Sequence, residues 1–217
     1  MLKVQLGGKQ QPLQRVLCLG AHCDDIEIGC GGALLRLIKE NPEIEIHWIV
    51  FSSNPKRKRE ALKAAKLFLQ GAAKSHVVVR TFKDGFFPYH GASIKKYFET
   101  LKRTIVPDLV FTHFRKDLHQ DHRLICDLTW NTFRGHFILE YEIPKYDGDL
   151  GSPNFYVAID GDLFRKKTKY ILDSFVSQSS KHWFTHDTFA GLARIRGVEA
   201  NCPEKYAEGF YCRKFSY

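Results

Sequence analysis

The sequence lacks any long hydrophobic run. No apolar stretch in its 217 residues approaches the roughly 20 residues that a membrane-spanning helix requires. Residues 1–15 are polar and contain no apolar core of the kind found in secretory signal peptides. Internal repeats, low-complexity tracts and linkers are also absent. We therefore expect a single domain over residues 1–217, without a transmembrane segment and located in the cytoplasm.

Cysteines with C-x-x-C spacing are absent as well, although the chain contains six cysteines. Cys18, Cys30 and Cys126 lie in apolar or glycine-rich surroundings. This usage favours reduced core residues over a disulfide framework or a zinc knuckle.

Acidic residues are scarcer than basic ones, 24 against 33, which gives a formal net charge of +9. A basic balance favours anionic partners such as nucleotide sugars, phosphorylated glycolipids, nucleic acid or a membrane surface. The basic runs at 56–59 and 165–167 lie in or beside helical patterns, so a solvated helix face is the alternative interpretation. No RNA-binding motif or recognition-helix signature accompanies them, and we expect no nucleic-acid partner.

Apolar runs typical of strands alternate with segments of helical periodicity. The expected strands lie at 16–19, 44–51, 77–82, 109–112, 137–143 and 155–159. The expected helices lie at 28–38, 56–70, 94–103, 124–133 and 163–175. Such alternation predicts right-handed strand–helix–strand units. The expected fold class is α/β, a single-domain Rossmann-like architecture with a mostly parallel sheet flanked by helices.

The first polar motif, Gly20-Ala-His-Cys-Asp-Asp25, follows the apolar strand at 16–19. Open α/β sheets place their ligands at the carboxyl ends of strands. Two adjacent carboxylates repel each other unless a cation or a shared proton relieves them. A metal ion could be held by His22 and one carboxylate, with the other carboxylate free as a base. The alternative is that Asp24 or Asp25 only caps the next helix.

A second polar motif, Asp117-Leu-His-Gln-Asp-His122, follows the expected strand at 109–112. It contains two histidines and two carboxylates within six positions. A catalytic zinc site needs three protein ligands and leaves its fourth position to water. Either motif alone could be a solvated loop, but their placement after two strands favours one shared metal site.

Glycines at 29, 31 and 32 follow the first motif. Glycines after a strand can cradle a pyrophosphate, but the G-x-G-x-x-G spacing of dinucleotide-binding proteins is absent. We expect these glycines to allow close packing of the helix against the sheet.

Both motifs resemble those of a known family. The AHPDDE…GCGG signature of the PIG-L/LmbE-like zinc-dependent N-deacetylases is similar to residues 21–25 (AHCDD) and 29–32 (GCGG). The second signature of that family, H-x-D-H, is similar to residues 119–122 (HQDH). Two residues depart from the pattern: Cys23 stands where the family usually has proline, and Ile26 where it usually has an acidic residue. Neither change removes a group that the chemistry requires.

The resemblance implies a zinc ion, or another divalent metal such as Fe²⁺, bound by His22, Asp25 and His122. It implies that Asp24 is the general base that takes a proton from water. His119 would stabilise the tetrahedral oxyanion and protonate the departing amine.

Other residues of the motifs have supporting roles in the same resemblance. Asp121 is expected to accept a hydrogen bond from His119 and so to favour its imidazolium form. Asp117 could share that role or only cap its loop. Arg57 and Asp84 match family positions that contact the sugar, with a solvated helix face and a turn as the respective alternatives.

The expected function is a zinc-dependent hydrolase that removes the acetyl group from an N-acetylated amino sugar of the N-acetylglucosamine type. The substrate could be linked to a nucleotide or another glycoconjugate, and could be anionic. One alternative is an amidase that acts on a non-sugar amide. Another is a non-catalytic protein that binds anions or nucleic acid on the same fold. The sequence does not indicate an oligomeric state.

Overall fold

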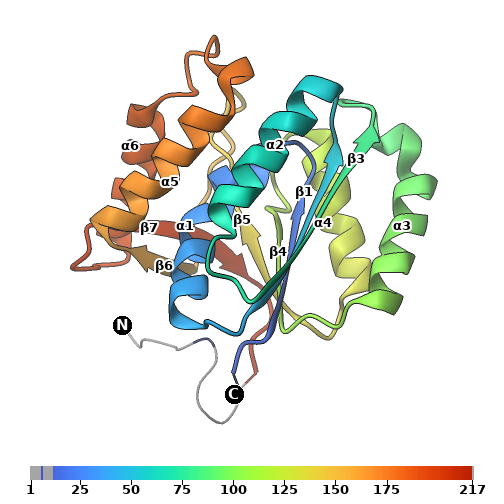
Figure 1. Cartoon of the computed structure of the whole chain (residues 1–217), viewed down its shortest axis with the longest axis horizontal. Helices are drawn as coiled ribbons and strands as arrows, with labels where there is room; N and C mark the ends of the chain where they lie inside the picture. Colours follow the sequence, from blue (N-terminus) through green and yellow to red (C-terminus); the bar gives the residue numbers. More distant parts are fainter. Residues whose placement is uncertain (1–5, 7–11, 217) are drawn as a thin grey trace.

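The computed structural model describes Leu6 and residues 12–216 (Figure 1). Most of the N-terminal segment in which we noted no signal-peptide core therefore lies outside the described residues. The strands are β1 (Arg15–Gly20), β2 (Glu45–Ser52), β3 (Lys74–Phe82), β4 (Leu109–His113), β5 (Phe137–Tyr141), β6 (Phe155–Ile159) and β7 (Tyr206–Cys212). The α-helices are α1 (Asp25–Glu40), α2 (Pro55–Phe68), α3 (Gly91–Thr104), α4 (Gln120–Thr132), α5 (Gly161–Ser174) and α6 (His186–Glu199). Two short 3₁₀ helices, η1 (Phe87–His90) and η2 (Val176–Gln178), complete the elements.

All seven strands join one sheet in the order β3-β2-β1-β4-β5-β7-β6. The first five are mutually parallel, and β7 is antiparallel to both of its neighbours. Residues 16–19 of β1 are fully buried, as expected for a central strand covered on both faces. The predicted α/β fold with a mostly parallel sheet flanked by helices is confirmed.

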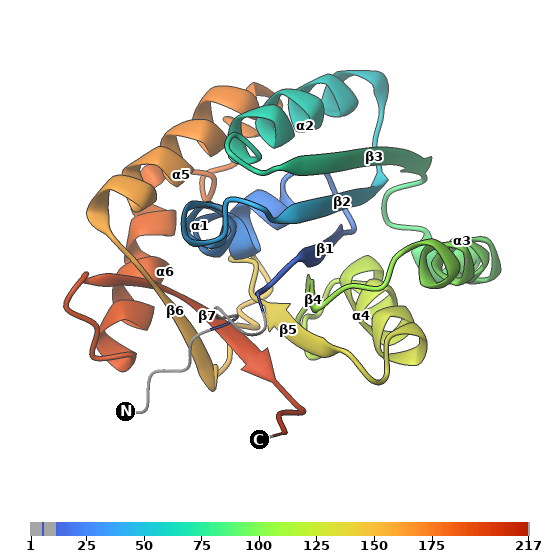
Figure 2. The ribbon, with the colours of Figure 1, turned by 60° about the horizontal axis from the view of Figure 1, so that its bottom comes forward.

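Helices cover both faces of the sheet (Figure 2). One face packs against α1, α2 and α5 through a large apolar cluster that includes Trp48 and Phe68. The other face packs against α3 and α4 through a second cluster that includes Phe51 and Phe98. Within the described residues, no helix combines the length and the apolar character needed to cross a bilayer.

The glycines of α1 allow close packing, as predicted. A Cβ atom at Gly29 would lie 2.1 Å from the Tyr141 ring, and one at Gly32 would lie 2.3 Å from Ile159. Real Cβ atoms do not approach other atoms this closely, so a side chain at either position would separate α1 from the sheet.

A buried carboxylate on β7 binds the middle of α1. Glu208 accepts hydrogen bonds from the amides of Gly32 and Ala33 at 2.8 and 2.7 Å. The ammonium of Lys167, on α5, donates to Glu208 and to the carbonyl of Ile28, both at 2.6 Å. These contacts tie β7 and α5 to the helix that follows the first polar motif.

Sequence analysis missed two elements in the C-terminal part, α6 and β7. In α6, Ile195 and Val198 face solvent while Arg196 is buried, so the helix shows no clear apolar stripe. In β7, the buried Glu208 interrupts the apolar pattern in the middle of the strand. Both elements depend on contacts with distant parts of the chain.

Candidate active site

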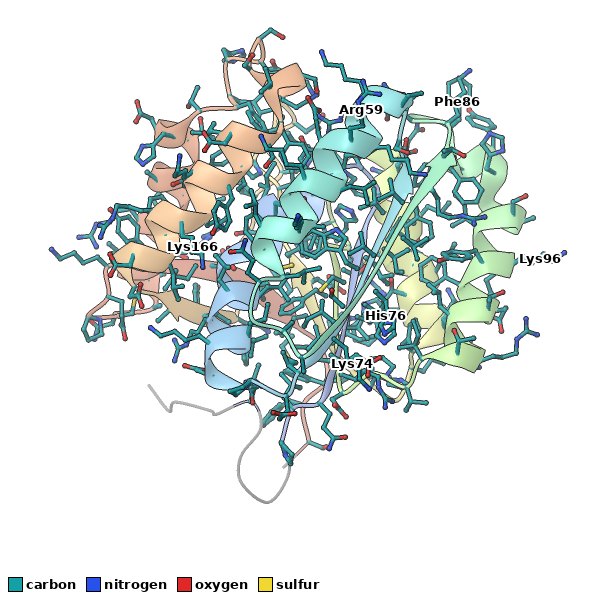
Figure 3. All side chains as sticks on the ribbon, in the orientation of Figure 1. Arg59, Lys74, His76, Phe86, Lys96 and Lys166 are labelled. Atoms are coloured by element: carbon teal, nitrogen blue, oxygen red, sulfur yellow. The ribbon has the colours of Figure 1, made fainter. Side chains whose placement is uncertain are left out.

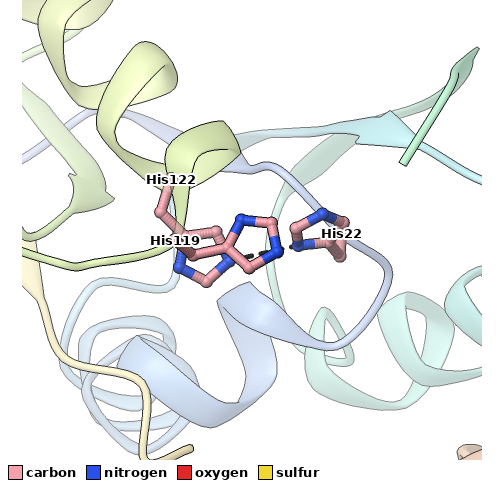
Figure 4. A group of neighbouring side chains, drawn as sticks. All are labelled: His22, His119 and His122. Carbon is pink, nitrogen blue, oxygen red and sulfur yellow. Dashed lines mark hydrogen bonds between the residues drawn. The ribbon is translucent and has the colours of Figure 1, made fainter. Parts of the chain in front are cut away.

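The two polar motifs meet at the carboxyl ends of β1 and β4. These strands are neighbours in the sheet, at the point where the strand order reverses direction, which is where open α/β sheets bind ligands. His22 and Asp25 lie between β1 and the first turn of α1, whereas His119 and His122 lie at the start of α4. Figure 4 shows the rings of His22, His119 and His122 side by side.

Three donor groups converge in this cluster. His22 Nδ1 lies 3.1 Å from His122 Nε2 and 3.4 Å from Asp25 Oδ2. The other Asp25 oxygen, Oδ1, lies 3.6 Å from His122 Nε2. Donors of a tetrahedral zinc site with bonds of about 2.0–2.1 Å are about 3.3 Å apart. The spacing of the three predicted ligands therefore fits a zinc ion.

Carboxylates on the far side of each imidazole orient the two histidines. Asp117 Oδ2 lies 2.9 Å from His122 Nδ1, so it favours a proton there and leaves Nε2 free. On His22, Nε2 lies 3.0 Å from Asp84 and 3.3 Å from Asp121, which favour a proton there, so Nδ1 is the nitrogen that could bind a metal. Burial lowers the pKa of His22, but the nearby carboxylates outweigh it and raise this pKa well above its usual value, so metal binding at Nδ1 displaces a proton. In both rings the nitrogen that could bind a metal faces the other predicted ligands.

Sequence analysis missed the role of Asp117 toward His122. Its other oxygen accepts the amide of His119 at 2.8 Å, which is the loop-capping role considered above. Lys145 also donates to its carboxylate at 2.9 Å. The spacing of five residues between Asp117 and His122, across a turn into a helix, was the available signal.

His113, the last residue of β4, was also missed. It is fully buried, and its ring stacks on His122 with centroids 3.9 Å apart. Its Nε2 atom accepts the amide of Ala21 at 2.9 Å and lies 3.2 Å from Asp25. His113 therefore positions the first motif, and a histidine at the end of a buried strand was its only signal.

The charges of the cluster suit a cation. Burial alone raises the pKa of Asp25, but the imidazoles of His122, His113 and His22 outweigh it and hold this pKa well below its usual range. Burial, reinforced by His113, lowers the pKa of His122 to about 3. Asp25 is thus an anion and His122 a neutral imidazole at neutral pH, the states in which these groups bind metal.

Asp24 is buried beside the predicted ligands, but its hydrogen bond is to Arg57 and not to any of them. It occupies the N-cap position of α1, yet its carboxylate makes no capping hydrogen bond. Instead it accepts a hydrogen bond from Arg57 at 2.7 Å. Burial raises the pKa of Asp24, although Arg57 opposes the shift. The capping alternative is therefore wrong for Asp24, and a buried carboxylate is available as a base.

The expected contact between Asp121 and His119 is different in the structure. The Asp121 carboxylate accepts the amides of Gly85 and Phe87 at 2.7 and 3.1 Å and faces His22. His119 Nδ1 instead accepts the Asp121 amide at 3.2 Å. Burial and the nearby His22 lower the pKa of His119, so its neutral form is favoured over the expected imidazolium.

A cavity of about 730 Å³ opens beside the cluster. Arg57 and Asp84, the two predicted substrate residues, both line it. The guanidinium of Arg57 is held by Asp24, whereas the Asp84 side chain is 73% exposed and contacts His22. The aromatic residues Tyr146 and Trp183 also line it.

Comparison with protein families identifies the chain. The family described as PIG-L, GlcNAc-PI de-N-acetylase, matches residues 17–133, which is more than half of the sequence. The match spans both polar motifs, Arg57 and Asp84. The chain belongs to the PIG-L family. The predicted enzyme class, a deacetylase among the hydrolases that act on amides, is confirmed by this membership.

Solved structures similar to this PIG-L protein share its fold. The N,N'-diacetylchitobiose deacetylase from Pyrococcus horikoshii has 22% identity and a TM-score of 0.69, over 92% of this chain and 84% of that one. The conserved protein TT1542 from Thermus thermophilus has 21% identity and a TM-score of 0.73, over 93% and 96%. GalB, the 4-carboxy-2-hydroxymuconate hydratase from Pseudomonas putida KT2440, has 18% identity and a TM-score of 0.72, over 94% and 98%. Because a hydratase shares the fold, the substrate must be argued from the site.

Proposed function

We propose that this PIG-L protein is a zinc-dependent hydrolase that removes the acetyl group from an N-acetylated amino sugar. The observation that carries the proposal is the convergence of His22, Asp25 and His122 beside a buried carboxylate, Asp24, that is not one of the three. Three protein ligands together with a separate base are what metal-assisted hydrolysis of an amide requires.

The donor set fits a zinc ion at this site. Two imidazole nitrogens that lie 3.1 Å apart, together with the Asp25 carboxylate, which has one oxygen 3.4 Å from His22 and the other 3.6 Å from His122, would hold it. Fe²⁺ accepts the same donors and is the alternative metal. When bound, zinc lowers the pKa of a coordinated water molecule towards 7 and polarises a carbonyl group.

We assign the proton transfers to Asp24. Its carboxylate takes a proton from the attacking water, and the amide C–N bond then breaks to release acetate and an amine. The amine needs one proton to leave. We expected His119 to supply it, but the lowered pKa of His119 favours the neutral ring. A buried carboxylate with a raised pKa suits a group that accepts a proton and returns it.

His119 then acts as a hydrogen-bond donor. The Asp121 amide donates to His119 Nδ1, so the proton of the neutral ring resides on Nε2. From Nε2 it can stabilise the negative charge that develops on the carbonyl oxygen of the acetyl group.

The cavity supports an amino-sugar substrate and permits an anionic one. Tyr146 and Trp183 offer aromatic surface, and the exposed carboxylate of Asp84 can accept hydrogen bonds from sugar hydroxyls. Of the basic side chains in the lining, Arg57 and Lys145 are already paired with carboxylates. Lys83 and Lys181 have no carboxylate within 4 Å among the described residues. Their ammonium groups are therefore available to bind an anionic group of the substrate.

Fewer side chains of the basic run at 56–59 line the cavity than the sequence suggested. Arg57 lines the cavity, but the side chains of Lys56 and Arg59 do not and are exposed. We therefore interpret these two as part of a solvated helix face (Arg59 in Figure 3).

The test is amine release by zinc-loaded protein from a panel of free, nucleotide-linked and lipid-linked N-acetyl sugars, with a simple non-sugar N-acetyl amide included. We expect at least one sugar to release free amine and the non-sugar amide to release none. For phosphate-bearing sugars the rate should fall as ionic strength rises, because screening shortens to about 8 Å at physiological salt. Cleavage of the non-sugar amide alone would identify an amidase. Absence of cleavage in fully zinc-loaded protein would favour the non-catalytic alternative.

A further inference from the structure

A second cluster of potential metal ligands lies at the opposite end of the sheet. Glu45 and His47 belong to the start of β2, and His76 belongs to the start of β3. Ser52 lies seven positions after Glu45, which corresponds to about 23 Å along the strand. Figure 3 shows His76 and Lys74 near the beginning of β3, far from Phe86, which lies beyond the other end of that strand.

The strand geometry brings these three side chains together. Side chains alternate between the two faces of a strand, so Glu45 and His47 share one face of β2. In the parallel register, His47 pairs directly with His76. The two imidazoles stack with centroids 4.7 Å apart and an interplanar angle of 15°. The convergence of these side chains therefore follows from the β2–β3 pairing itself.

Both histidines present the same nitrogen to one carboxylate oxygen. His47 Nε2 lies 2.8 Å from Glu45 Oε1, and His76 Nε2 lies 3.3 Å from the same atom. The three donor atoms all lie within 4.8 Å of one another. These separations are close to the 3.3 Å or so expected between ligands of a tetrahedral zinc ion.

We propose that Glu45, His47 and His76 form a second binding site for a zinc-type transition-metal ion, separate from the active site. Two imidazoles and one carboxylate suit Zn²⁺ and similar ions, whereas Mg²⁺ and Ca²⁺ prefer oxygen ligands alone. The side chain of His76 is 55% exposed, so the ion can enter from solvent and complete its coordination with water.

Neighbouring charges limit the affinity of this site. Arg15 Nε lies 3.7 Å from Glu45 Oε2, the oxygen that faces away from the histidines. Lys74 pairs in register with Glu45 across the two strands. Both cations oppose a dication, so the second site binds metal more weakly than the active site.

The consequence of metal binding is a cross-link between β2 and β3. Among the described residues, strand β3 lies at an edge of the sheet, and β2 is the strand with which it pairs. An ion bound by residues of both strands stabilises this pairing in proportion to its concentration and affinity.

The test counts zinc equivalents. Chelator-stripped wild-type protein and the His76→Ala variant are titrated with zinc against a chromophoric competitor, with Mg²⁺ as the control ion. We expect His76→Ala to bind one equivalent fewer than the wild type. Equal stoichiometry would overturn the proposal, whether or not the active site binds zinc. The substitution removes an exposed side chain, so the fold should be retained, which circular dichroism checks.

Two further variants locate the site. Glu45→Gln keeps the shape of the side chain but removes its charge, and it should lose the same equivalent as His76→Ala. His186→Ala removes another exposed histidine that also lies beside a carboxylate, Asp187, and it should bind as the wild type does. If His186→Ala loses the equivalent and His76→Ala keeps it, the second ion binds elsewhere and the assignment is wrong.

Discussion

The two histidine clusters at the opposite ends of the sheet contain the same ligand types but are held differently. At the carboxyl end, His122 is 3% exposed and its second nitrogen is bonded to Asp117. At the amino end, the charged-group and ring-stacking contacts of His47 and His76 within the described residues are to Glu45 and to each other. The carboxyl end has in addition a buried carboxylate, Asp24, and a cavity of about 730 Å³. Donor atoms alone thus permit metal binding, whereas catalysis requires the groups around them.

Removal of a predicted active-site ligand should have the largest effect. In His122→Ala, zinc affinity at the carboxyl end should fall by more than about 100-fold, and turnover should disappear. This loss exceeds the one typical of residues that only hydrogen-bond to a metal ligand. The amino-end cluster should keep its equivalent, because His122 does not contact it. Competitive zinc titration and amine release measure both effects. Unchanged affinity would mean that the third ligand lies elsewhere.

Asp24→Asn should separate metal binding from turnover. The substitution removes the proposed base but none of the three proposed ligands, so turnover should fall by about 100- to 10,000-fold while zinc remains bound. Metal analysis together with amine release measures the two quantities in one preparation. Asp187→Asn, a fully exposed carboxylate at the start of α6, is the control. A zinc-free Asp24→Asn protein would make Asp24 a ligand.

Asp117→Asn tests whether the outer carboxylate explains the difference between the clusters. Loss of the charge that faces His122 Nδ1 should weaken zinc binding by about 10- to 100-fold. The matched control is Asp149→Asn, because Asp149 also binds Lys145 but does not contact His122. Its zinc affinity should stay close to that of the wild type. Equal weakening in both variants would assign the effect to Lys145 instead.

Cys23→Ala should have the smallest effect. The thiol is 1% exposed and donates a hydrogen bond to the carbonyl of Ser52 at 3.2 Å. Burial raises the pKa of Cys23 to about 12, which disfavours the reactive thiolate. Zinc binding and turnover should therefore stay within a few-fold of the wild type. Reversible inactivation by peroxide that disappears in Cys23→Ala would contradict this and make the residue a redox switch.

Much of the parallel half of the fold was predictable because its signals are local. The apolar runs of β1 and β4, and the part of β2 that follows His47, are continuous, as is typical of buried parallel strands, and polar motifs follow two of these strands. The meeting of His22 with His122 followed from strand ends sharing one edge of a sheet. The family signatures added the assignment of roles, which spacing alone left open.

The unpredicted part depends on tertiary contacts. The ring of His113 stacks on His122, and Asp117 is hydrogen-bonded to it. Neither contact produces a periodic pattern in the sequence. The predicted hydrogen bond between Asp121 and His119 is wrong, because the Asp121 carboxylate accepts the amides of Gly85 and Phe87, which follow β3. No local pattern indicates that this loop lies beside α4.

The contact between Glu208 and α1 has a consequence for biosynthesis. A ribosome releases the chain from its N-terminus, so the residues of the metal cluster emerge long before Glu208, which lies 175 residues after Ala33. Until Glu208 arrives, the amides of Gly32 and Ala33 lack this buried acceptor in the middle of α1. The helix that begins beside Asp24 is therefore fully anchored only after translation has passed Glu208, and until then a nascent chain carries its predicted metal ligands next to a helix that lacks this contact.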